Sequence, residues 1–70
     1  MTQFEITLNG KPFRSADQSI ADLIKSLGLP GQGRGVAVAL DGEVLTHSRW
    51  ASARLEPGQR VEIVTATQGG

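Results

Sequence analysis

The chain has 70 residues, no cysteine, and seven basic side chains balanced by seven acidic ones. This composition excludes disulfide cross-links and argues against nucleic-acid binding, which needs clustered positive charge. The N-terminal residues lack the basic start and apolar run of a signal peptide, and no segment is long enough to span a membrane, so we expect one small cytoplasmic domain over residues 1–70 with no membrane partner.

The first predicted element is a β-hairpin. Apolar and polar side chains alternate over residues 4–8, which is typical of a half-buried strand. Asn9-Gly10 then predicts a tight turn, and residues 11–14 form the return strand. Because Pro12 has no backbone N–H, this return strand is expected at an edge of the sheet.

A short helix follows. Apolar side chains recur at the spacing of one helical stripe, at Ile20, Leu23, Ile24 and Leu27. Ser19 is the predicted N-cap, and Gly28 is placed to end the helix. Such a short helix must gain most of its stability by packing this stripe against a sheet.

The second half of the chain predicts a hairpin and a final strand. Residues 36–40 and 43–45 flank the turn dipeptide Asp41-Gly42. Residues 46–54 are expected to be irregular or to form a single helical turn, with Trp50 and Leu55 as core anchors. The apolar run over residues 61–66 is the last predicted strand.

This order of elements indicates the fold class. The first and last strands are the most apolar, so we place them side by side and parallel at the centre of a mixed sheet of four to five strands. The helix then covers one face. The prediction is an α+β protein with a β-grasp, ubiquitin-like fold.

The sheet face opposite the helix is predicted to carry small apolar side chains. Alternation along the strands places Ala37, Ala39, Val64 and Ala66 on it. Single exposed apolar residues are ordinary, but as a group these four favour a docking surface for a partner protein. His47 is the only histidine and has no neighbouring cluster of ligands, so we expect neither a catalytic residue nor a metal site.

The chain ends in Gly69-Gly70, a few residues after the last predicted strand. We interpret residues 67–70, with Gln68 and Gly69 as the stem, as a flexible tail that presents the α-carboxylate of Gly70. Glycine has no Cβ, so two in a row can enter a narrow active site. The carboxylate is ionised near neutral pH and can attack the α-phosphate of ATP. The alternative interpretation is an inert frayed terminus.

Several of these segments together resemble the ThiS family, the sulfur carriers of thiamine biosynthesis. The resemblance rests on Val36-Ala-Val-Ala-Leu-Asp-Gly-Glu-Val44, Arg49-Trp50, Leu55-Glu-Pro-Gly58, Val61-Glu-Ile-Val64 and Gly69-Gly70. The chain departs from the usual family pattern at Gln59, where aspartate is common, and at Leu45-Thr46, where proline is common. Both departures lie away from the tail.

The resemblance implies a carrier that is a co-substrate rather than an enzyme and binds no cofactor itself. An adenylating enzyme of the ubiquitin-activating type (ThiF- or MoeB-like) would use ATP and Mg²⁺ to adenylate Gly70. A sulfurtransferase or cysteine desulfurase would supply a persulfide that converts the adenylate to a thiocarboxylate. Thiazole synthase would then receive the sulfur.

Other functions share the same fold and tail. The nearest is the small subunit of molybdopterin synthase, although residues 65–68 lack the aromatic or proline-rich stretch usual in that carrier. A protein modifier joined to lysine, a sulfur donor for another metabolite, and a β-grasp interaction domain with an inert tail are the remaining alternatives.

Overall fold

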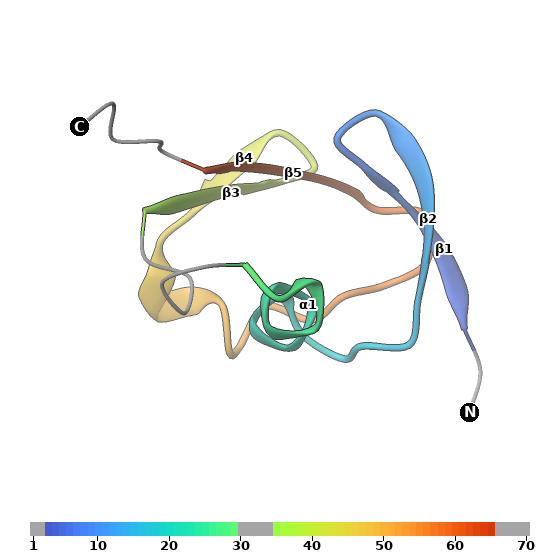
Figure 1. Cartoon of the computed structure of the whole chain (residues 1–70), viewed down its shortest axis with the longest axis horizontal. Coiled ribbons are helices and arrows are strands. Elements are labelled where there is room, and N and C mark those ends of the chain that lie inside the picture. The colour runs from blue at the N-terminus through green and yellow to red at the C-terminus, as the bar shows by residue number, and fades with distance from the viewer. Residues whose placement is uncertain (1–2, 30–34, 66–70) are drawn as a thin grey trace.

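The computed structural model describes residues 3–29 and 35–65 of the chain, and within these ranges five strands and one α-helix are present (Figure 1). The elements are β1 (Phe4–Leu8), β2 (Lys11–Ser15), α1 (Ile20–Leu27), β3 (Val36–Leu40), β4 (Glu43–Leu45), the 3₁₀ helix η2 (His47–Arg49) and β5 (Arg60–Thr65). The predicted tail and Ala66 lie outside the described residues. Strand β2 extends one residue beyond its predicted end, and β5 begins one residue before its predicted start.

The strands form a single mixed sheet in the order β2-β1-β5-β3-β4. The first and last strands are parallel neighbours, with β5 at the centre, and the other pairings are antiparallel. Figure 1 shows α1 lying across one side of the curved sheet. The predicted β-grasp topology is therefore confirmed, as is the edge position of β2, the strand that contains Pro12.

Both predicted hairpin turns are present, and both have the same backbone geometry. The φ angles are +50° and +82° at Asn9 and Gly10, and +50° and +86° at Asp41 and Gly42. Positive φ at both central residues defines a type I′ turn, whose twist matches that of the paired strands. Asparagine, aspartate and glycine are the residues that adopt this conformation at least cost, which explains the turn positions.

Helix α1 has the predicted caps. The Ser19 Oγ accepts a hydrogen bond from the Asp22 backbone N–H at 3.1 Å, and Gly28 adopts a left-handed conformation with φ +67°. The connection from β4 to β5 runs beside the helix. It receives two hydrogen bonds from the first turn of α1, from Ile20 N–H to the Ala53 carbonyl and from Ala21 N–H to the Trp50 carbonyl, both 3.0 Å.

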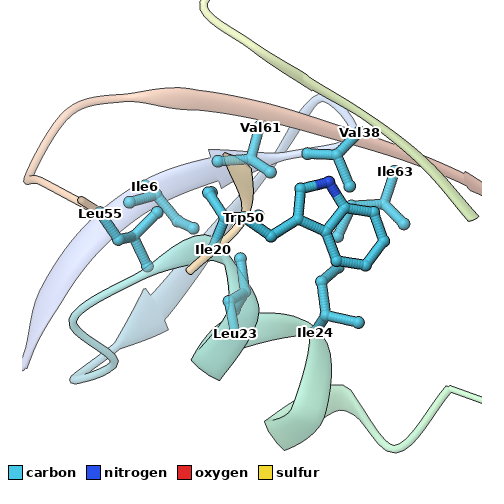
Figure 2. Close-up of a cluster of buried hydrophobic side chains, with 9 residues drawn as sticks. All are labelled: Ile6, Ile20, Leu23, Ile24, Val38, Trp50, Leu55, Val61 and Ile63. Carbon is cyan, nitrogen blue, oxygen red and sulfur yellow. The ribbon is translucent and has the colours of Figure 1, made fainter. Parts of the chain in front are cut away.

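The hydrophobic core lies between α1 and the sheet (Figure 2). Leu23 of the helix and Val61 of β5 are fully buried. The Trp50 indole lies between Ile24 of the helix and Val38 of the sheet, and its Nε1–H donates to the Leu45 carbonyl at 3.4 Å. The remaining buried apolar residues are Ile6, Ile20, Leu55 and Ile63. The predicted helix stripe and core anchors are thus confirmed, with Leu27 packed at the margin of the core.

One buried polar residue joins β2 to the helix. Ser15, at the end of β2, is buried, and its Oγ donates to Asp17 Oδ2 at 3.0 Å. The same Oγ accepts from the Asp17 backbone N–H, also at 3.0 Å, while Ser26 of α1 donates to Asp17 Oδ1 at 2.9 Å. The Asp17 carboxylate therefore fixes the path of the chain between the edge strand and the helix.

Candidate functional site

The predicted reactive residue, Gly70, lies outside the described residues, as do Gly69 and Gln68. The structure does show the end of the strand from which the chain continues toward these residues. Strand β5 ends at Thr65, which is paired with Val36 at the start of β3. Residues 66–70 therefore follow directly from the central strand of the sheet, at the end where β3 begins.

The sheet face opposite the helix carries an apolar patch at this same end. Ala37 of β3 and Val64 of β5 are directly paired, and both are exposed, with 64% of Val64 accessible to solvent. Ala39, two residues further along β3, is half-buried and lies on the same face. The structure therefore brings together three of the four residues predicted for a docking surface, while Ala66 lies outside the described residues.

A fourth described residue, Val44 of β4, belongs to the patch and was not predicted from the sequence. It is paired with Ala39 and is 74% exposed. The signal for it was present, because a two-residue turn at Asp41-Gly42 places Leu40 opposite Glu43 and therefore Ala39 opposite Val44. We call Ala37, Ala39, Val44 and Val64 the open-face patch.

A single acidic side chain interrupts this patch. Glu62 of β5 is exposed and is paired with Ala39 on the side opposite Val44, so the row across the three strands reads Val44, Ala39, Glu62. Alternation along β5 places Glu62 on the same face as Val64. Covering this surface would desolvate one carboxylate, which is costly unless the covering group supplies a positive charge.

The helix side of the molecule has a separate apolar hollow of about 520 Å³, lined by Ala21, Ile24, Lys25, Leu29, His47, Trp50 and Ala51. Its one aromatic pair is formed by His47 and Trp50, with ring centroids 4.4 Å apart and planes inclined by 43°. His47 is exposed and Trp50 is 4% exposed. The prediction of Trp50 as a core residue is therefore confirmed, and His47 lies at the surface.

Within residues 3–29 and 35–65, no group of three or more His, Asp or Glu side chains is placed to hold a metal ion. The same ranges contain no helix with the length and apolar character that crossing a bilayer requires. The features that stand out in the described part of the chain are thus the open-face patch and its position beside the end of β5.

Comparison with known proteins agrees with this geometry. The model of the ThiS family matches residues 6–70. Two solved structures of a thiamine biosynthesis protein (ThiS) from Geobacter metallireducens, one by crystallography and one by solution NMR, are each 30% identical to this chain with a TM-score of 0.78. Both alignments cover 96% of this chain, and they cover 100% of the crystallographic chain and 88% of the NMR chain. No curated protein matches the sequence significantly.

The family match covers nearly the whole chain, including β3, β5 and the terminal Gly69-Gly70, and the structural match extends over the same sheet and helix. The chain belongs to the ThiS family.

Proposed function

We propose that this protein is a sulfur carrier for the synthesis of the thiamine thiazole, and that Gly70 carries the sulfur as a C-terminal thiocarboxylate. The observation that supports this proposal most strongly is the family match, which runs to residue 70 and therefore includes the Gly-Gly dipeptide. The same match favours the thiazole pathway over molybdopterin synthesis. Residues 67–70 act as the tail of a domain that spans residues 1–70.

The first step requires an ionised carboxylate and an activated phosphate. The Gly70 carboxylate attacks the α-phosphate of ATP in the active site of an adenylating enzyme of the ubiquitin-activating type, and pyrophosphate leaves. Mg²⁺ bound with ATP belongs to that enzyme. The contribution of this chain is the terminal Gly69-Gly70 dipeptide, which has no side chains and leaves the terminal carbonyl accessible.

The second step replaces AMP by sulfur. A persulfide, supplied through a sulfurtransferase or a cysteine desulfurase, attacks the acyl carbon of Gly70 and AMP leaves. The product is an acyl disulfide, in which a new C–S bond joins Gly70 to the outer sulfur of the persulfide. A thiol then attacks the inner sulfur, so that the original S–S bond breaks, a disulfide forms on the partner side, and the thiocarboxylate remains on Gly70. Because this chain has no cysteine, both the persulfide and the thiol belong to partner proteins. Thiazole synthase is the acceptor of the sulfur.

The open-face patch is the proposed docking surface for the adenylating enzyme. It spans β3, β4 and β5, the last of which leads toward the tail, and Val44 and Val64 present large apolar side chains that the fold leaves exposed. A partner that covers them gains hydrophobic stabilisation without any rearrangement of the core. The Glu62 carboxylate adds a requirement for a cationic side chain opposite it.

Removal of Gly70 tests the proposed chemistry. The shortened chain should fold normally, because residues 4–65 form the strands, the helix and the hydrophobic core, but it should support no ATP–pyrophosphate exchange with the adenylating enzyme. Gln68→Ala, which keeps the length of the tail and its two glycines, is the matched control and should retain exchange. Exchange that persists without Gly70 would contradict the proposal, provided that circular dichroism shows both variants to be folded.

A further inference from the structure

The side chain of Asn9 binds the main chain of β5 at two points. Its Nδ2 donates to the Ile63 carbonyl at 3.2 Å, and its Oδ1 accepts from the Ile63 N–H at 2.8 Å. The Asn9 backbone N–H also donates to the Val61 carbonyl at 2.9 Å. The carboxamide thus provides one acceptor and one donor to the main chain of β5. A further residue of a neighbouring strand would provide the same two groups, but β1 has already ended at Leu8.

This contact reinforces the shorter of the two pairings made by β5. Strand β5 is paired with β1 at only two positions, Thr7 with Arg60 and Leu8 with Val61, whereas its pairing with β3 runs over five. The Asn9 carboxamide lengthens the β1–β5 pairing toward the C-terminal half of β5. The N-terminal hairpin is therefore joined to the central strand partly through a side-chain amide.

That amide belongs to a chemically labile dipeptide. Asn9 is the only asparagine in the chain, and it is followed by glycine, whose missing Cβ leaves the backbone nitrogen open to approach. When the Gly10 nitrogen loses its proton and attacks Asn9 Cγ, a C–N bond forms, the Cγ–Nδ2 bond breaks, and ammonia leaves with the proton. The five-membered succinimide that results takes up water at either carbonyl and opens to aspartate or isoaspartate. Water and ammonia balance the reaction, and no electrons are transferred.

We propose that Asn9 is a deamidation site that is controlled by its contact with β5. In the folded chain both polar atoms of the carboxamide are bound to Ile63, and turning Cγ toward the Gly10 nitrogen breaks both hydrogen bonds. The reaction therefore proceeds from conformations in which β5 has released the amide. Its rate follows the fraction of time spent in those open states.

The products cannot restore the contact. An ionised aspartate at position 9 still accepts from the Ile63 N–H, but it has no proton to donate, and its second oxygen faces the Ile63 carbonyl. Isoaspartate adds a methylene to the main chain inside the type I′ turn. Each product therefore weakens the β1–β5 pairing. Deamidation in an open state thus leaves a permanent chemical change that favours further separation of position 9 from β5.

The other hairpin turn provides an internal comparison. Asp41 occupies the same position in its turn and also contacts β5, but its Oδ1 only accepts, from the Arg60 N–H at 2.8 Å. The donor in that contact is the Asp41 backbone N–H, which binds the Arg60 carbonyl at 2.7 Å. A carboxylate is sufficient at position 41, whereas position 9 requires an amide.

The kinetics of deamidation test the protective part of the proposal. The intact protein is incubated at mildly alkaline pH in the presence and absence of guanidinium chloride, beside a synthetic peptide of residues 5–14, and peptide mass spectrometry follows Asn9. We expect the folded protein to react at least about tenfold more slowly than the peptide, in proportion to the population of open states. The denatured protein should match the peptide. Equal rates in folded protein and peptide would overturn the proposal.

A reciprocal pair of variants tests whether deamidation at position 9 weakens the β1–β5 pairing. Asn9→Asp, which is the deamidation product, should lower the folding equilibrium constant about tenfold, the effect expected when a hydrogen-bond donor is removed and an acceptor is left unsatisfied. It should also accelerate hydrogen exchange at the Ile63 amide. Asp41→Asn keeps the acceptor and should change neither quantity. An Asn9→Asp protein as stable as the unmodified chain would refute the coupling between this site and β5.

Discussion

The substitution Val64→Asp tests whether Val64 belongs to a docking surface or to the core, because it should affect partner binding and folding stability differently. Complete burial of a valine side chain contributes about 1.5 to 3 kcal/mol. Since Val64 is 64% exposed in the free protein, a partner that covers it gains about 1 to 2 kcal/mol from this residue. Loss of that contribution corresponds to an increase in Kd of about 5- to 30-fold, and the cost of desolvating the new carboxylate adds to it.

The effect of Val64→Asp on folding should be much smaller. Exposed substitutions usually change the free energy of unfolding by about 0.5 kcal/mol, and strand preferences span about 1 kcal/mol. We therefore expect the variant to lose no more than about 1 kcal/mol of stability. Val61→Asp, on the same strand but fully buried, places a carboxylate in the core and should prevent stable folding.

Titration calorimetry with the adenylating enzyme measures Kd, and denaturant unfolding measures stability. Gln18→Glu is the matched charge control, because it adds one negative charge at an exposed position on the segment that leads into α1. Its affinity should equal that of the unmodified chain. If Val64→Asp leaves Kd unchanged, or if it lowers stability as much as Val61→Asp does, the docking assignment is wrong.

Substitutions at two further positions test the core and the charge within the patch. Leu23→Ala removes a fully buried side chain and should lower the free energy of unfolding by about 2 to 5 kcal/mol in a urea titration, and a change near zero would contradict its place in the core. Glu62→Lys should weaken association with the adenylating enzyme more than Glu62→Gln does, and added salt should weaken association of the unmodified chain. Equal affinities for the two Glu62 variants would show that no cationic side chain faces this position.

Most of the fold could be predicted because its signals are local. Alternation identified β1 and β3, the helical stripe identified α1, and Asn9-Gly10 and Asp41-Gly42 fixed the hairpins. The parallel pairing of β1 with β5 followed from their apolar character, since the most apolar strands belong at the centre of a sheet that is covered on one face. Even Val44 could have been placed on the open face by counting residue pairs outward from the second turn.

The contacts that join distant segments could not be predicted in this way. Asn9 was recognised as a turn residue, but its hydrogen bonds to Ile63 span 54 positions and exist only because β1 and β5 are neighbours. The same is true of Asp41 and Arg60, which are 19 positions apart. Turn propensity explains why these residues occupy their positions but does not show that their side chains also hold the central strand.

For the candidate site, the sequence indicates the reactive residue, and the structure adds the surface around the strand that leads to it. The chemistry proposed for Gly70 rests on the sequence and on family membership, while the strand pairings show the surroundings of β5. They place Val44 beside Ala39, set Glu62 in the same row, and locate the patch at the end of β5 from which the chain continues toward Gly70. The sequence therefore suggested the reactive group, and the fold shows the exposed apolar surface that we propose as the docking site.

The central claim is that sulfur is carried on the last carbonyl of Gly70, and intact-mass spectrometry of protein purified from cells tests it most directly. We predict a species heavier by the exchange of one carboxyl oxygen for sulfur, which reacts with a thiol-alkylating reagent at the C-terminus and is absent when Gly70 is removed. Incubation with the adenylating enzyme, ATP and a persulfide donor should increase it. A terminus that stays an unmodified carboxylate under all of these conditions would contradict the account.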